Sequence, residues 1–203
     1  MGFYDKYILP VMLNAAMNQK PIRYQRQKVV PQAEGRILEI GIGSGLNLPF
    51  YDPAKVEKVW GLDPSAELRT YAEKEAAQVP FNVEFIGLEA EDIPLDDNSM
   101  DTVLMTYTLC TIPDAHTALR NMRRVLKPGG KLIFCEHGKA PDEAVQKWQN
   151  RINPIWKRIA GGCNLNRKIP QLIEEGGFNL GEVDTMYIPG PKPMTFNYWG
   201  SAT

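Results

Sequence analysis

The sequence is short of cysteine, and its three cysteines form no recognisable pattern. Cys110, Cys135 and Cys163 are too few and too far apart for a disulfide framework, and none belongs to a CxxC pair of the kind that binds zinc. The sequence therefore predicts a reducing, cytoplasmic setting and no metal site.

Charge of one sign is also lacking. The chain has 23 Lys and Arg against 24 Asp and Glu, with a formal net charge of −1. Such a balance gives no field that would gather nucleic acid or anionic lipid, so we expect no nucleic-acid partner. No feature of the sequence indicates an oligomeric state.

Long apolar runs are absent as well. No stretch approaches the roughly 20 apolar residues that cross a bilayer. The amino-terminal apolar run is interrupted by Pro10 and Asn14, which is not typical of an export signal. We therefore expect no integral membrane segment. A length of 203 residues without a linker or repeat fits a single domain over residues 1–203.

Strand-like and helix-like segments alternate through most of the chain. Apolar runs predict strands at residues 36–40, 58–63, 83–89, 101–108 and 131–136. Helical spacing of apolar residues predicts a helix at 115–130 and one at 65–78, the latter with Leu68, Tyr71, Ala72 and Ala76 facing inward. This alternation predicts an α/β fold with a doubly wound sheet, and it places a ligand site at the carboxyl ends of the strands.

Three glycines occupy alternate positions directly after the first predicted strand. Gly41, Gly43 and Gly45, in the sequence LEIGIGSG, provide bare backbone that a ligand can approach. A dinucleotide fingerprint would place its third glycine at Leu46, so the pattern does not favour a pyrophosphate. Glu39 would repel phosphate and suits a cationic ligand.

Two carboxylates follow at the ends of the next strands. Asp63 can accept hydrogen bonds from both hydroxyls of a ribose. The alternative, in which Asp63, Pro64 and Ser65 only begin a helix, is weaker in combination with the glycines. Glu89 and Ala90 end the third strand, where a side-chain acceptor and a main-chain N–H could read an adenine edge.

Together these motifs resemble those of the class I S-adenosylmethionine-dependent methyltransferases. LEIGIGSG, LDPS, EAEDIPLDDNSMD and RRVLKPGGKLIFCEH follow one another in the order and spacing of that superfamily across residues 35–137. Within it, GLNLPFYDP, TLCTIPD, CEHGKAP and NPIWKRIAGGCNL are similar to the methyltransferase-like thiol S-methyltransferases and their bacterial relatives.

The resemblance implies a Rossmann-like fold with a seven-stranded, mostly parallel sheet that ends in an antiparallel C-terminal hairpin. It also implies S-adenosylmethionine as the cofactor and a small-molecule acceptor. The candidate cofactor-binding residues are Glu39, Gly41, Gly43, Gly45, Asn47, Leu48, Asp63, Pro64, Ser65, Glu89, Ala90, Thr106 and Leu109.

The same resemblance implies three parts, namely a helical cap at residues 1–33, a cofactor-binding core at 34–137 and a substrate-side helical insertion at 138–170. The candidate substrate residues are Tyr4, Tyr7, Cys110, Trp156 and Cys163. An apolar stripe crosses the insertion at Val145, Trp148, Ile152, Ile155, Trp156 and Ile159. Such a stripe is more often core than pocket. In the alternative, its tryptophans cover an active-site mouth and favour an apolar substrate.

Methyl transfer from a sulfonium depends chiefly on alignment, so a general base is optional. His137 is the candidate base, with an ordinary structural histidine as the alternative. The expected reaction is S-methylation of a small apolar thiol. N-methylation of a lipid headgroup or small amine, and a non-catalytic S-adenosylmethionine-binding protein, stay open. Arsenite binding by the cysteines ranks low, because Cys135 falls inside a strand.

Overall fold

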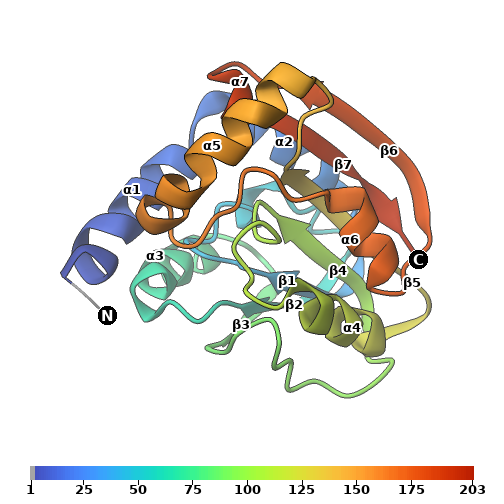
Figure 1. Ribbon diagram of the computed structural model, residues 1–203. Helices are drawn as coiled ribbons and strands as arrows, with labels where there is room; N and C mark the ends of the chain where they lie inside the picture. The colour runs from blue at the N-terminus through green and yellow to red at the C-terminus, as the bar shows by residue number, and fades with distance from the viewer. Residues whose placement is uncertain (1–2) are drawn as a thin grey trace.

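The computed structural model describes residues 3–203, which form one mixed sheet with helices on both faces (Figure 1). The strands are β1 Gly35–Ile40, β2 Val56–Leu62, β3 Asn82–Ile86, β4 Met100–Thr106, β5 Leu126–His137, β6 Leu180–Tyr187 and β7 Phe196–Ala202. The α-helices are α1 Leu9–Met17, α2 Lys20–Val29, α3 Ala66–Ala76, α4 Ala115–Val125, α5 Glu143–Ile159, α6 Ile169–Glu175 and α7 Lys192–Thr195. Short helical turns cover Tyr4–Ile8, Val30–Gln32 and Leu48–Phe50.

The sheet has the order β3-β2-β1-β4-β5-β7-β6. Strands β1 to β5 pair in parallel, whereas β7 is antiparallel to both β5 and β6. The chain order reverses between β1 and β4, and that switch point is where ligands bind in such sheets. The predicted fold class, seven-stranded and mostly parallel with an antiparallel C-terminal hairpin, is confirmed.

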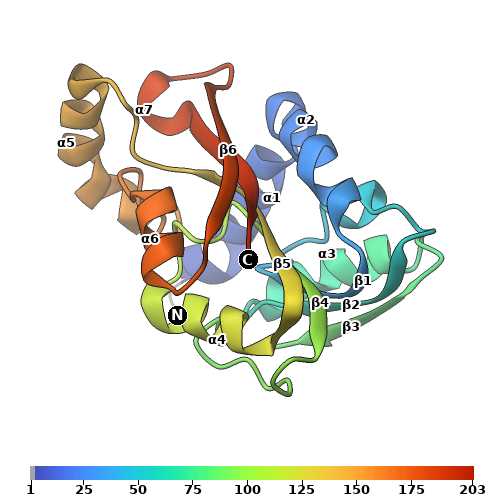
Figure 2. The same ribbon diagram turned by 90° about the vertical axis from the view of Figure 1, so that its right-hand side faces the viewer.

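The side chains of successive residues in β1 enter two separate cores. Ile37 packs with Val29 of α2 on one face, and Leu38 packs with Leu119 of α4 on the other. Figure 2 shows the two layers, with α2 and α3 on one side of the sheet and α4 and α6 on the other. Both faces being covered explains why the strands read as continuous apolar runs rather than alternating ones.

Helices α3 and α4 begin where side-chain caps occur. Ser65 accepts a hydrogen bond from the backbone N–H of Leu68, and Asp114 accepts one from that of Thr117. Leu119, Met122 and Val125 of α4 are fully buried, but Tyr71 of α3 is 36% exposed, so its predicted inward position is wrong. Helix α4 ends at Val125, because Pro128 cannot continue it, and the following residues already belong to β5.

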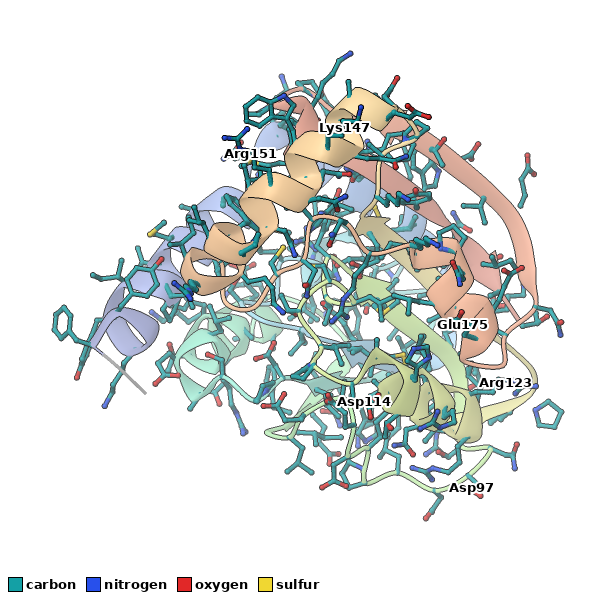
Figure 3. The ribbon with its side chains drawn as sticks, viewed as in Figure 1. Asp97, Asp114, Arg123, Lys147, Arg151 and Glu175 are labelled. Atoms are coloured by element: carbon teal, nitrogen blue, oxygen red, sulfur yellow. The ribbon has the colours of Figure 1, made fainter. Side chains whose placement is uncertain are left out.

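The apolar stripe predicted for α5 is only partly buried. Val145 is buried and Trp156 half-buried, but Trp148 and Ile155 are 57% and 67% exposed. Lys147 and Arg151 extend from the outer face of the helix (Figure 3), and Arg151 lies over the Trp148 ring. The stripe is therefore not a continuous core face. Within residues 3–203, none of the helices combines the length and apolar character that crossing a bilayer would take. The division into cap, core and insertion stays a prediction.

Candidate active site

One cavity of about 480 Å³ lies at the carboxyl ends of β1, β2 and β4. Its volume is within the range of small-molecule sites. Gly43 and Asp63 line one end, and His137 and Trp156 line the other. Helix α1 closes the cavity from outside and lies beside the C-terminal end of α5 (Figure 1), where the Tyr4 hydroxyl donates a hydrogen bond to the carbonyl of Ile159.

The glycine loop after β1 forms the wall at the first end. Gly41, Gly43 and Gly45 all have positive φ angles, of 67°, 53° and 79°. An added Cβ at Gly41 would clash with Thr108, and one at Gly45 would press against α3. At Gly43, which lines the cavity, the nearest atom would be 3.8 Å away. Gly43 is therefore the glycine that leaves room for a ligand.

Asp63 holds this loop in place as well as lining the cavity. Its carboxylate accepts hydrogen bonds from the backbone N–H of Gly43 at 3.0 Å and of Ser65 at 2.9 Å. Burial raises the pKa of Asp63, and these two hydrogen bonds act against the rise. The sequence left two roles open for Asp63, ribose binding and the start of a helix. The structure is compatible with both, because Asp63 precedes α3 and also lines the cavity.

A buried polar network supports the loop from below. Glu39 accepts hydrogen bonds from Asn47 at 2.9 Å and from Tyr51 at 2.6 Å. Arg26 donates to Asn47 at 2.6 Å and to Thr106 at 2.8 Å. Glu39 is 1% exposed and does not line the cavity, so the prediction that its carboxylate faces the ligand directly needs correction. Glu39 is linked to the cavity wall through Asn47, which is hydrogen-bonded to Arg26 and Thr106.

Burial also gives Glu39 an unusual titration. Desolvation raises its pKa to about 7 from 4.5, although the hydrogen bonds from Tyr51 and Asn47 oppose the rise. Because the folded chain holds the proton of Glu39 more tightly than the unfolded chain, Glu39 contributes to the free energy of unfolding at low pH. This contribution is fully present below about pH 4.5 and is lost as the pH rises through about 7. Between pH 5 and 8 the free energy of unfolding should therefore fall by on the order of 3 kcal/mol from this group.

The Glu39→Gln variant should not show that fall, because its side chain stays neutral. Thermal unfolding of wild type and variant at both pH values measures the difference, and the exposed Glu57→Gln is the control that should follow wild type. Parallel pH profiles of wild type and Glu39→Gln would contradict the assignment.

The remaining candidate cofactor residues are distributed differently. Gly41 and Thr106 line the cavity. Asn47 is buried in the polar network, and Leu48, Ala90 and Leu109 are buried in the interior. Glu89 and Pro64 are exposed, and Ser65 caps α3. The structure therefore does not bring Glu89 and Ala90 to the cavity wall, and their contact with an adenine stays a prediction.

The other end of the cavity brings together four predicted residues. Trp156, Cys110, Cys163 and His137 all line it. His137 Nε2 lies 3.1 Å from Cys163 Sγ, and Trp156 Nε1 donates a hydrogen bond to the same sulfur at 3.2 Å. All three cysteines are free thiols, and Cys135 lies in the core as expected.

These contacts set the protonation of the thiols. Hydrogen bonding by Cys110, together with His137 and Trp156, lowers the pKa of Cys163 to about 4 despite its burial. Burial acts to lower the pKa of His137, but the Cys163 thiolate beside it raises the pKa overall. Cys163 is therefore the most acidic of the three cysteines.

The candidate substrate residues Tyr4 and Tyr7 do not line the cavity. Tyr4 ties the amino-terminal turn to α5, and the ring of Tyr7 is 56% exposed. Their predicted contact with the substrate is not supported, because neighbouring residues of α1, including Met12 and Leu13, occupy the wall instead.

Tyr107 and Arg26 are two of the cavity residues that sequence reasoning missed. Tyr107 follows β4 with a φ of 56°, a strained conformation for a non-glycine residue, and its hydroxyl donates to Asn197 at 2.5 Å. Arg26 comes from α2, far from every motif. No local pattern marks either one, since their roles depend on contacts distant in sequence.

Comparisons with known proteins identify the family. A family model for a methyltransferase domain matches residues 38–134. Thiol S-methyltransferase TMT1B of Rattus norvegicus is 36% identical over 78% of this chain, which spans 65% of that relative's length. The human TMT1B is 33% identical over 87% of this chain and 75% of its own length. The chain belongs to the S-adenosylmethionine-dependent methyltransferase family.

Other members of the methyltransferase family are more distant. Phosphatidylethanolamine N-methyltransferase of Cereibacter sphaeroides is 30% identical over 56% of this chain and 57% of its own length. A solved S-adenosylmethionine-dependent methyltransferase from Thermotoga maritima covers 98% of both chains with a TM-score of 0.65 and 24% identity, which supports the fold alone.

Family membership makes S-adenosylmethionine the cofactor, and the first end of this methyltransferase's cavity fits it. The backbone at Gly43 is open to a ligand, and the carboxylate of Asp63 can accept ribose hydroxyls. Arg26 adds a buried cation whose Nε has no hydrogen-bond partner within residues 3–203.

Proposed function

We propose that this chain transfers the methyl group of S-adenosylmethionine to the sulfur of a small apolar thiol. The observation that carries the proposal is that one continuous cavity is lined by both Asp63 and Trp156. A cofactor at the first end and an acceptor at the other would therefore share one space. The similarity to thiol S-methyltransferases over most of the chain supports a thiol as the acceptor.

The cofactor supplies an electrophilic methyl group on a sulfonium sulfur. The contribution of the chain is then to hold the donor and acceptor in line, for which positioning can supply about 7–11 kcal/mol. On the cofactor side, we assign Asp63 to the ribose and Arg26 to the carboxylate of the amino-acid portion. The Gly43 loop lies against the ligand's main body.

The acceptor end of the cavity is lined mainly by apolar side chains. Leu9, Met12 and Leu13 of α1 face Trp156 and Ile159 of α5 across the cavity. Met12 and Ile159 are about half exposed, so the apolar surface continues to the mouth. An apolar acceptor would cover this surface, whereas a charged one would lose hydration without a matching partner.

The assignment of Asp63 to the ribose can be tested by substitution. Asp63→Ala should weaken S-adenosylmethionine binding by about 10- to 150-fold, because it removes a charged acceptor worth roughly 1.5–3 kcal/mol. Asp63→Asn, which keeps one acceptor oxygen for the Gly43 N–H, should lose less. Titration calorimetry measures both, and wild-type affinity for the alanine variant would refute the ribose assignment.

The class of acceptor can be tested by comparing thiols with amines. Small apolar thiols should be methylated faster than amines, and the rate should rise from about pH 6 toward the thiol pKa of about 8.5, because the thiolate is the nucleophile. Alkylamines stay protonated through that range and would need a base. The protein is incubated with labelled cofactor and with thiols and amines of matched size. The rate of label transfer to each acceptor is then compared across this pH range.

The similarity to phosphatidylethanolamine N-methyltransferase favours amine methylation as the second candidate function. A panel in which lipid or aryl amines accept label and thiols do not would establish it in place of the first. Label transfer to no acceptor, with calorimetric binding of the cofactor intact, would favour a non-catalytic binding protein.

A further inference from the structure

Three metal-ligating side chains converge at the acceptor end of the cavity. Cys110 follows β4, His137 ends β5 and Cys163 follows α5, yet their ligand atoms all lie within 4.8 Å of one another. Each comes from a different element, so no sequence spacing reveals the cluster. Both cysteines are buried and His137 is half-buried.

The spacing is close to that of a tetrahedral zinc centre. With Zn–S near about 2.3 Å and Zn–N near about 2.0–2.1 Å, ligand atoms around zinc lie roughly 3.5–3.8 Å apart. His137 Nε2 and Cys163 Sγ, at 3.1 Å, would separate slightly, and no pair would need to close by more than about an ångström. Side-chain rotation alone supplies such movements.

Hydrogen bonds hold the two cysteine loops against each other. The backbone N–H and the side-chain amide of Asn164 both donate to the carbonyl of Cys110, each at 2.9 Å. Arg167 donates to the carbonyls of Leu109 and Ile112 on either side of Cys110. The ligands are therefore preorganised by their supporting residues rather than brought together by the ion.

The surroundings provide what a bound dication requires. Trp156 Nε1 donates to Cys163 Sγ, as outer-shell donors commonly do to metal ligands. Glu136, adjacent to His137, is fully buried, and its Oε1 accepts from the backbone N–H of Thr108 and Leu109. Its Oε2 has no hydrogen-bond partner in the described part of the chain. A buried carboxylate oxygen without a partner thus lies on the residue next to His137.

We infer that Cys110, His137 and Cys163 form a zinc site whose fourth coordination position opens into the acceptor end of the cavity. Two cysteines and one histidine are a ligand set of catalytic zinc sites, which keep one position for water or substrate. The inference replaces the sequence-based expectation that the chain has no metal site.

The role of the ion rests on the proposed function. An acceptor thiol that binds zinc loses its proton to solvent and stays a thiolate near neutral pH. Its sulfur then forms the bond to the methyl carbon while the bond from that carbon to the sulfonium sulfur breaks. The thioether product carries no charge, binds zinc weakly and leaves. No oxidant or reductant is needed.

Cobalt substitution tests the site without relying on activity. The full chain, reduced and treated with a chelator, should bind one equivalent of Co²⁺ with thiolate-to-cobalt charge-transfer absorption and the intense d–d bands of a tetrahedral centre. Zn²⁺ should displace it. Failure to bind an equivalent of either ion, or octahedral bands without thiolate absorption, would overturn the inference. A Cys110–Cys163 disulfide that forms again after the reductant is removed, with no metal bound, would also overturn it.

Ligand variants make the test specific. Cys110→Ser, Cys163→Ser and His137→Gln should each weaken Zn²⁺ binding by more than about 100-fold, and Trp156→Phe by about 10-fold. Cys135→Ala, which alters a cysteine in another core cluster, is the matched control and should bind like wild type. Retained binding of S-adenosylmethionine shows that a variant is folded. Equal metal affinity in all variants would refute the assignment.

The acceptor role is separable from both the site and the proposed function. Adding an apolar thiol should shift the cobalt bands, and zinc-loaded protein should methylate it at least about 10-fold faster than the metal-free form. Equal rates would refute the role of zinc while leaving thiol methylation intact. Metal binding with no thiol turnover in either form would leave the site established and refute the proposed function.

Discussion

Gly43→Val is expected to reduce the affinity for S-adenosylmethionine by more than about 100-fold. Gly43 has a φ of 53° and lines the cavity, with no atom closer than 3.8 Å to an added Cβ. A branched side chain would thus meet no close protein atom but would occupy the space of the ligand. Its strained backbone should cost only about 1–2 kcal/mol of stability.

The control separates backbone strain from ligand exclusion. Gly177 has a φ of 91° and nothing within 4 Å of an added Cβ, but it does not line the cavity. Gly177→Val should therefore lower the melting temperature by a similar few degrees and bind the cofactor normally. Titration calorimetry beside thermal unfolding measures both effects. Normal cofactor binding by Gly43→Val would show that this loop is not the cofactor cradle.

Gln149→Ala is expected to lower the free energy of unfolding by on the order of 3–5 kcal/mol. Gln149 belongs to α5 and is fully buried on its inner face. Its amide nitrogen lies within 3.1 Å of the carbonyls of Gly138, Leu165 and Pro193, and its oxygen accepts from the backbone N–H of Ala140. Alanine leaves these four backbone groups without this partner.

The same substitution should affect the two ends of the cavity unequally. Gln149 joins α5 to the segment after β5 and to the loop of Leu165, both of which border the acceptor end. We expect the acceptor's Michaelis constant to rise more than the dissociation constant of the cofactor, and the melting temperature to fall by about 10 °C. Gln146→Ala, at a partly exposed position of the same helix, is the control. It should change the Michaelis constant and the melting temperature little. A wild-type melting temperature for Gln149→Ala would contradict the role of this residue.

The parts of the fold that depend on local pattern could be predicted from the sequence. The positions of Gly41, Gly43 and Asp63 follow from strand ends, because parallel strands all deliver their carboxyl ends to one edge. Glu39 shows the limit of such reasoning. Its place next to the glycines suggested contact with the ligand, yet residues of β1 alternate between the two faces, and its carboxylate turns into the interior toward Asn47 and Tyr51.

The acceptor end could not be predicted to the same depth. Gln149 and Asn164 act through contacts between segments far apart in the chain, and neither belongs to a motif. The stripe on α5 was misleading because helical spacing does not say how much of an apolar face another element covers. Trp156 faces the cavity, whereas Trp148 on the same helix is exposed.

The proposed reaction is tested most directly by one acceptor that offers both nucleophiles. In 4-aminothiophenol the aryl amine is unprotonated at neutral pH, so both the nitrogen and the sulfur of one molecule are available to accept the methyl group. The full chain is incubated with this compound and with S-adenosylmethionine carrying a ¹³C-labelled methyl group, and the product is examined by carbon NMR. Our account predicts the label on sulfur as an S-methyl group. Label on nitrogen alone, or unlabelled acceptor after prolonged incubation, would contradict it.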